Sequence, residues 1–77
     1  MGWEYRRVHF MQDHILDSSA PNQRHPLRNR HEEGLTFHTL VLRRLNDLGR
    51  EGWEVATGDE QEHMAVYLLK RQTGPQS

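Results

Sequence analysis

The chain has 77 residues, with 11 acidic and 10 basic side chains and a net charge of −1 at pH 7 when its six histidines are neutral. One small domain is expected at this length, and a chain with so balanced a charge is not the strongly basic kind that binds nucleic acid nonspecifically. The absence of cysteine excludes disulfides, thiolate metal sites and a cysteine nucleophile. No apolar run approaches the roughly 18 residues of a membrane span, and the N-terminus shows no apolar signal core, so we expect a cytoplasmic protein.

The first predicted element is a strand over residues 3–10, where aromatic and β-branched side chains favour extended backbone. Its apolar residues lie on one face at Trp3 and Tyr5 and on the other face at Val8 and Phe10. This change of face predicts a β-bulge between Tyr5 and Val8, or a strand that is partly covered on both faces.

The next segment, residues 11–36, has few apolar side chains and contains prolines, asparagines, serines and a glycine. These residue types favour turns and interrupt regular structure. We therefore expect an irregular loop over 11–36. A loop of this length is usually functional or disordered.

A helix is predicted over residues 37–48, because Phe37, Val41, Leu45 and Leu48 recur at helical spacing. Thr36 is the expected N-cap, and Gly49 is the expected left-handed residue after the last turn. Strands are predicted over 53–57 and 63–71, separated by a polar turn at 58–62. The polar tail, residues 72–77, is expected to be flexible.

These elements predict a single α+β domain over residues 1–71 in the order strand, long loop, helix, strand, strand. The expected sheet has three strands, antiparallel or mixed, and one helix covers one face. The last strand is nevertheless apolar on both sides, with Tyr67 and Leu69 on one face and Val66 and Leu68 on the other. Soluble monomers rarely expose such a patch. A homo-oligomer that packs its open sheet faces or its edge strands together would cover it; alternatively, the 11–36 loop folds back over the open face.

Three stretches together are similar to a known family: Trp-Glu-Tyr-Arg at 3–6, Leu-Asn-Asp-Leu-Gly-Arg-Glu-Gly-Trp-Glu-Val at 45–55, and Tyr-Leu-Leu-Lys-Arg at 67–71. They resemble a widespread bacterial family of small domains of unknown function, with a Trp-Glu-Tyr-Lys start, a Leu-Gly-x-Glu-Gly-Trp-Glu centre and a Leu-Lys-Arg end. The resemblance implies a small strand–helix–strand–strand fold and no established activity. The chain departs from the family in its long loop and at Arg7, where an apolar residue is common. Fold maintenance accounts for these motifs, and a ligand pocket built on Trp3 and Trp53 is the alternative.

Chemistry-bearing patterns are sparse. The histidines give two local groups with carboxylates, Asp13-His14 with Asp17 and His31-Glu32-Glu33, but neither has a recognised metal-ligand spacing. The serines lie in the loop and the tail, away from any histidine pattern that would activate a nucleophile. We therefore expect no metal, no cofactor, no catalytic residue and no enzymatic activity.

The predicted function is a non-enzymatic homo-oligomeric interaction or regulatory module. Arginine outnumbers lysine by 9 to 1, and its guanidinium binds carboxylate or phosphate in bidentate fashion. The alternative is therefore an oligomer that binds a small anionic ligand such as a nucleotide or metabolite. The expected partners are a second copy of the chain and an unidentified protein or small anion, without nucleic acid or membrane. The candidate surface combines the open sheet face with the loop, through Tyr5, Arg7, Arg24, Arg28, Arg30, Tyr67 and Leu69.

Overall fold

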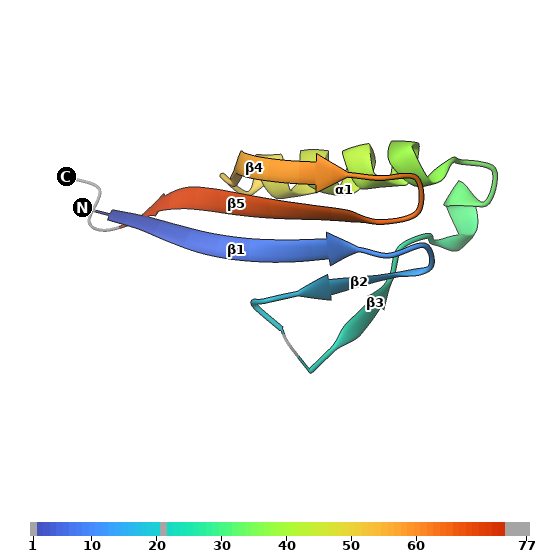
Figure 1. Ribbon diagram of the computed structural model, residues 1–77, viewed down its shortest axis with the longest axis horizontal. Helices are drawn as coiled ribbons and strands as arrows, with labels where there is room; N and C mark the ends of the chain where they lie inside the picture. Colours follow the sequence, from blue (N-terminus) through green and yellow to red (C-terminus); the bar gives the residue numbers. More distant parts are fainter. Residues whose placement is uncertain (1, 21, 74–77) are drawn as a thin grey trace.

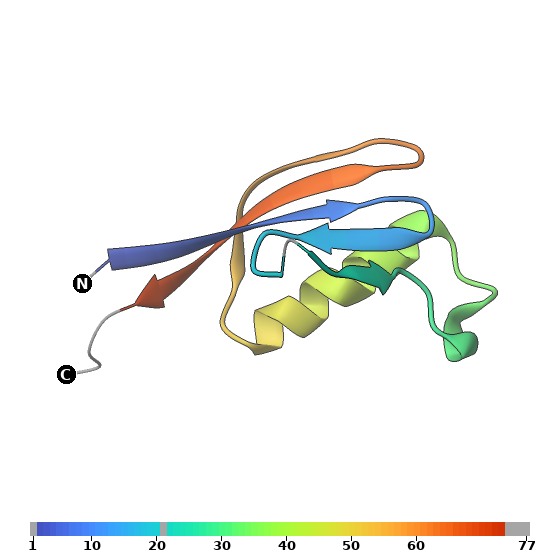
Figure 2. The ribbon, with the colours of Figure 1, turned by 90° about the horizontal axis from the view of Figure 1, so that it is seen from below.

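The computed structural model describes residues 2–20 and 22–73. In chain order the elements are β1 (Gly2–Phe10), β2 (His14–Asp17), β3 (Arg24–Pro26), the 3-10 turn η1 (Arg30–Glu32), α1 (Phe37–Arg50), β4 (Glu54–Glu60) and β5 (Ala65–Thr73). The five strands form one antiparallel sheet in the order β3-β2-β1-β5-β4. Helix α1 lies against one face of this sheet (Figure 1, Figure 2).

The long central pair of strands determines which residues face the helix. β1 pairs with β5 without interruption, from Gly2 opposite Thr73 to Phe10 opposite Ala65. Directly opposed residues of an antiparallel pair lie on the same face, so the pairs Val8–Tyr67 and Arg6–Leu69 both face α1. Among residues 2–20 and 22–73 no helix covers the other face, which we call the open face. Its side chains are Trp3, Tyr5, Arg7 and His9 of β1, Leu16 of β2, Arg24 of β3, Glu54, Thr57 and Asp59 of β4, and Val66, Leu68, Lys70 and Gln72 of β5.

The core lies between the sheet and α1. Its largest fully buried side chains are Phe10, Leu27, Leu40, Leu69, Val8 and Val41. The rings of Phe10 and Tyr67 meet edge to face, with centroids 6.0 Å apart. Leu27 comes from the connection between β3 and η1, so part of the segment predicted as an irregular loop completes the core.

The helix begins as predicted and ends later. Thr36 is the N-cap, and its hydroxyl accepts a hydrogen bond from the backbone N–H of Thr39. Gly49 remains helical, so the prediction that it ends the helix is wrong. Gly52, at φ 95°, is the left-handed residue instead. The backbone N–H groups of Gly52 and Trp53 donate to the carbonyls of Gly49 and Leu48 at 3.0 and 3.1 Å, which is the Schellman pattern of helix termination.

The α+β class is confirmed, but the prediction of three strands is corrected to five. β2 has four residues and β3 has three, and strands this short carry too few residues to show an alternating pattern. They form because β1 offers its free edge to β2, and β2 then pairs with β3. The 11–36 segment thus widens the sheet instead of covering the open face: Ile15 packs against the core, and Leu16 remains 37% exposed.

Two local predictions about the strands are also corrected. The described part of β1 contains no bulge between Tyr5 and Val8. The irregularity lies in β4, where Val55 opposes Leu69 and Thr57 opposes Leu68, leaving Ala56 without a partner in the ladder. The last strand starts at Ala65 and continues through Thr73, so Gln72 and Thr73 of the expected tail belong to β5. Residues 74–77 lie outside the described residues.

Candidate functional site

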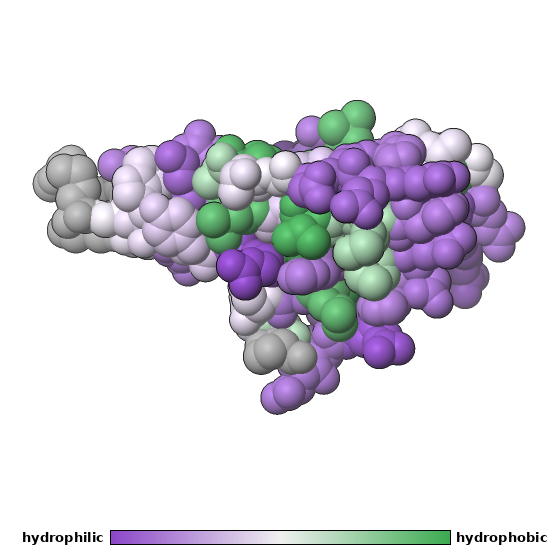
Figure 3. Space-filling view, viewed as in Figure 1, coloured by the Kyte–Doolittle hydropathy of each residue, from purple (hydrophilic) through white to green (hydrophobic). Residues whose placement is uncertain are grey.

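The open face carries an apolar centre with charged groups around it. Val66 and Leu68 of β5 lie beside Leu16 of β2 across β1, and Tyr5 is 60% exposed on the same face. Figure 3 shows this side of the molecule, with apolar side chains at its middle and polar groups over much of the rest. Figure 2 shows that the outer ends of β1 and β5 project beyond the helix as a two-stranded ribbon. Val66 and Leu68 are neighbours on β5, and His9 of β1 separates Val66 from Leu16. Exposed apolar patches rimmed by polar residues mark interaction sites.

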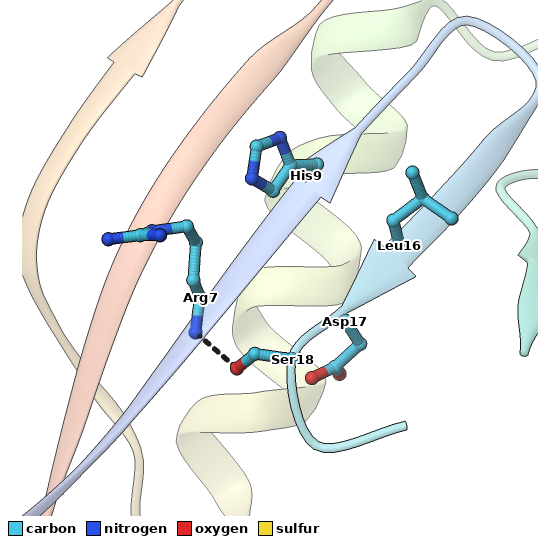
Figure 4. Close-up of a pocket in the computed structure, with 5 residues that line it drawn as sticks. All are labelled: Arg7, His9, Leu16, Asp17 and Ser18. Carbon is cyan, nitrogen blue, oxygen red and sulfur yellow. Dashed lines mark hydrogen bonds between the residues drawn. The ribbon is translucent and has the colours of Figure 1, made fainter. Parts of the chain in front are cut away.

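Arg7 lies between two shallow hollows on the open face. The first, about 300 Å³, is lined by Arg7, His9, Leu16, Asp17 and Ser18. Figure 4 shows Arg7 and His9 on β1 and Leu16 on β2, with the Ser18 hydroxyl accepting the backbone N–H of Arg7 at 2.9 Å. The second hollow, about 230 Å³, is lined by Arg7, Thr57, Gly58, Asp59, Val66 and Leu68. Within residues 2–20 and 22–73, the Arg7 guanidinium makes no ion pair.

Charge on the open face differs between strands. β1 contributes Arg7 and His9, whereas β4 contributes Glu54 and Asp59. The Asp59 carboxylate accepts a hydrogen bond from Gln61 at 3.2 Å. Lys70 is engaged locally: its Nζ lies 4.5 Å from the centroid of the Trp3 ring and 3.9 Å from Glu54 Oε1. The basic side of the face is therefore β1, and the acidic side is β4.

The two sheet edges are poorly suited to pairing with another strand. β4 is exposed along its whole length, and it carries acidic residues and the bulge at Ala56. β3 is three residues long and ends at Pro26, which lacks a backbone N–H. Charges, bulges, prolines and short edge strands all oppose edge-to-edge association. The sequence predicts assembly either through the edge strands or through the open face. These edges oppose the first mode.

The strand residues predicted to form the interaction surface lie on two different faces of the sheet. Tyr5 and Arg7 lie on the open face as expected. The expectation that Tyr67 and Leu69 lie there is wrong: Leu69 is 1% exposed and Tyr67 packs against the core under α1. The alternation of β5 had identified the two faces correctly but did not show which one the helix covers. Val66, Leu68 and Asp59 occupy the open face and were missed as site residues.

The three loop arginines do not form one cluster. Arg24 lies on β3 opposite Leu16, so it is exposed on the open face, at the far side of β2 from Arg7. Arg28 is used structurally, because its Nη1 donates to the carbonyls of Glu32, Glu33 and Leu35 at 2.8, 2.9 and 2.7 Å. Arg30 is exposed in η1. Arg28 therefore holds together the chain between η1 and α1. The sequence predicts a role for it in binding instead.

A second polar cluster fastens η1 to α1. The buried Glu32 carboxylate accepts the backbone N–H of Asn29 at 3.1 Å, pairs with Arg44, and lies 3.3 Å from Arg43 Nη1. The hydrogen bond from Asn29 and the Arg44 charge hold the pKa of Glu32 below its usual range, against the effect of burial. Arg44 and Arg50 also pair with Asp47. Because these charges satisfy one another, the cluster is a structural clamp.

A third cluster joins the start of α1 to the end of β4. Glu60 pairs with His38, and its other oxygen accepts the Tyr67 hydroxyl at 2.5 Å. The Tyr67 hydrogen bond and the contact with His38 keep the pKa of Glu60 below its usual range. Neither histidine–carboxylate group named from the sequence forms a metal site: in the described part of the chain, no three His, Asp or Glu side chains are placed to hold an ion.

No protein-family model, curated protein or solved structure matches the chain. The resemblance to the bacterial family of small domains therefore stays a prediction from the quoted motifs. Among the residues described by the structure, no helix has the length and apolar character to cross a membrane.

Proposed function

We propose that the protein is a homodimeric interaction module whose two copies pack through their open faces. The observation that carries this proposal is the composition of that face: an apolar centre at Leu16, Val66 and Leu68, with a basic strand on one side and an acidic strand on the other. An isologous interface requires a surface that is complementary to itself. A face with both signs of charge around an apolar centre meets that requirement better than it meets the needs of a strongly charged partner.

The size of the face also favours a second copy. The molecule extends 44 × 22 × 20 Å, and Figure 1 looks down the shortest of these axes onto the open face. A standard protein interface buries about 800 Å² on each partner. The broad face provides surface on that scale, and two sheets pack face to face with their mean strand directions within about 30° of each other.

The proposal is tested by light scattering over a concentration series, with two matched variants. Leu68→Glu places a charge at the centre of the open face, and we expect it to convert a dimer into a 9.1 kDa monomer. Leu42→Glu is the control, because Leu42 is 59% exposed on α1, away from the open face. We expect Leu42→Glu to keep the mass of the parent protein. A parent protein that is monomeric at every concentration would overturn the proposal.

A small anionic ligand is the second candidate, and the position of Arg7 favours it. This guanidinium borders both hollows of the open face and makes no ion pair within the described residues. Inorganic phosphate is the simplest probe. At 100 times its dissociation constant, a ligand stabilises the folded state by about 2.7 kcal/mol, which corresponds to a rise in Tm of at least ~10 °C for a domain of this size. An Arg7→Gln protein should lose that rise.

A further inference from the structure

We propose that the two copies are related by a two-fold axis parallel to β5, so that Arg7 and His9 of one copy face Asp59 of the other. This inference rests on the proposed homodimer and specifies its register. It starts from the two cross-strand rows of the open face: His9, Val66 and Asp59 form one row, and Arg7, Leu68 and Thr57 form the next. In each row the β1 residue is basic, the β5 residue is apolar, and the β4 residue is acidic or polar.

Two sheets packed face to face by a two-fold operation have their axis in the plane between them. An axis that runs across the strands would lay each strand over its own copy. Arg7 would then lie over β1 of the partner, which carries the basic residues, and Asp59 would lie over β4 of the partner, which carries the acidic residues. Such like-charge contacts oppose association. An axis parallel to the strands but centred on β1 brings Arg7 against itself in the same way.

An axis parallel to the strands and centred on β5 avoids both conflicts. It lays β5 over β5 and places β1 of each copy over β4 of the other. Rotation about this axis keeps each residue at its position along the strand, so His9 faces Asp59 of the partner and Arg7 lies one row away. An arginine side chain reaches over that distance. Val66 and Leu68 then stack on their own copies at the centre of the interface, while Leu16 on β2 lies at the rim, beyond the partner's β4.

The local contacts of the other charged groups agree with this register. Lys70, which also lies on β5, is paired with Glu54 and stacked on Trp3 of its own chain. Its charge is therefore balanced before the copies meet. Arg7 and Asp59 are both exposed and make no ion pair with each other or with any other described residue. They are the charges that an opposing copy would bring together.

Charge reversal tests this contact by complementation. In Arg7→Glu two carboxylates oppose each other at both ends of the interface, and in Asp59→Arg two guanidinium groups do so. We expect each single variant to dimerise at least ~100-fold more weakly than the parent protein. In a mixture of the two single variants, both contacts join opposite charges, so a heterodimer should form. The Arg7→Glu/Asp59→Arg double variant should regain the parent dissociation constant to within about tenfold.

The outcomes separate the register from the dimer itself. Sedimentation equilibrium of one fluorescently labelled variant, with and without the other, measures the heterodimer directly. Arg30→Glu is the matched control, since Arg30 is an exposed arginine in η1, and it should leave the dissociation constant unchanged. A dimeric parent protein whose two single variants do not complement each other would overturn the register but leave the proposed function standing. A monomeric parent protein would overturn both.

A second measurement needs no substitution. Attraction between Arg7 and Asp59 is screened by salt, because the Debye length falls from about 10 Å at 0.1 M to about 3 Å at 1 M ionic strength. The parent dimer should therefore dissociate more readily in 1 M sodium chloride than in 0.1 M. Dimerisation that is unchanged or stronger at high salt would indicate a purely apolar contact and would contradict the proposed pairing.

Discussion

Gly58 and Tyr67 are direct cross-strand partners, and the tyrosine ring fills the space that a side chain on Gly58 would occupy. A Cβ at position 58 would lie 2.3 Å from Tyr67 Cδ1 and 2.4 Å from Cε1. The ring cannot move freely away, because its other side meets Phe10. Glycine at this position of β4 therefore allows the Tyr67 ring to pack closely against the backbone.

We predict that Gly58→Ala lowers the free energy of unfolding by about 1–3 kcal/mol, the usual cost of forcing extra atoms into a packed site. The corresponding fall in Tm is roughly 4–8 °C per kcal/mol for a domain of this size. Gly49→Ala is the matched control. Gly49 is helical and has no atom within 4 Å of an added Cβ, so alanine there should raise stability by about 0.5–1 kcal/mol. Equal effects of the two substitutions would contradict the packing described for Tyr67.

Leu27 tests whether the connection before α1 is part of the core. The side chain is fully buried, although the segment has the composition of a loop. We predict that Leu27→Ala costs about 2–5 kcal/mol, enough to unfold a large fraction of so small a domain. Leu42→Ala removes the same atoms from a leucine that is 59% exposed, and it should change stability by less than about 0.5 kcal/mol. Urea denaturation followed by circular dichroism measures both; a mild effect at Leu27 would mean that the connection does not contribute to the core.

How far the sequence predicts this fold depends on the length of each periodic segment. The helix was recognised from Phe37, Val41 and Leu45, because three or four turns show a clear period. Its end was misplaced by two residues, since Gly49 and Gly52 both fit the composition of a helix end and only the backbone shows which has positive φ. β2 and β3 were missed because their formation depends on an available edge of β1, which is a tertiary property.

The candidate site was predictable only in part, for a similar reason. Tyr5 and Arg7 were placed correctly, because the alternation of β1 separates them from Val8 and Phe10. The alternation of β5 gives two apolar faces of nearly equal quality, and nothing local distinguishes Tyr67 from Leu68. The distinction comes from the register with β1, in which Tyr67 opposes Val8 and Leu68 opposes Arg7.

The Arg6–Asp17 ion pair predicts a loss of stability in acid. Arg6 Nε lies 2.9 Å from both oxygens of Asp17, and Nη2 lies 2.5 Å from Oδ2. Partial burial raises the pKa of Asp17, but hydrogen bonds from Arg6 and Ser19 outweigh it and keep the pKa below its ordinary value. A folded-state pKa below the unfolded one stabilises the protein above that unfolded value, near pH 4. This stability is lost as the pH falls through the folded-state pKa.

We therefore expect Asp17→Asn to cost about 1–3 kcal/mol at pH 7 and to make stability less dependent on pH below about pH 4. The comparison is made by thermal unfolding at a series of pH values. Arg6→Gln serves as the second side of a double-mutant cycle, and the two losses should not add, because each removes the same pair. Additive losses, or an acid limb unchanged by Asp17→Asn, would show that the pair does not contribute as described.

Tyr67 predicts a loss of stability at the alkaline end. Burial, together with the hydrogen bond to Glu60, raises the pKa of Tyr67 from 10.0 to about 12. Because the folded-state pKa is above the unfolded one, this contribution is complete below pH 10 and is lost as the pH rises through about 12. Tyr67→Phe keeps the ring against Phe10 and Gly58 and removes only the hydroxyl.

This substitution should cost about 0.5–1.5 kcal/mol at neutral pH and flatten the alkaline limb of the stability curve. Tyrosinate absorbance supplies the independent check, since it should show a group titrating near pH 12 in the parent protein that is absent from Tyr67→Phe. If the parent protein and Tyr67→Phe lost stability with the same slope above pH 10, the hydrogen bond to Glu60 would not be the source of the alkaline dependence.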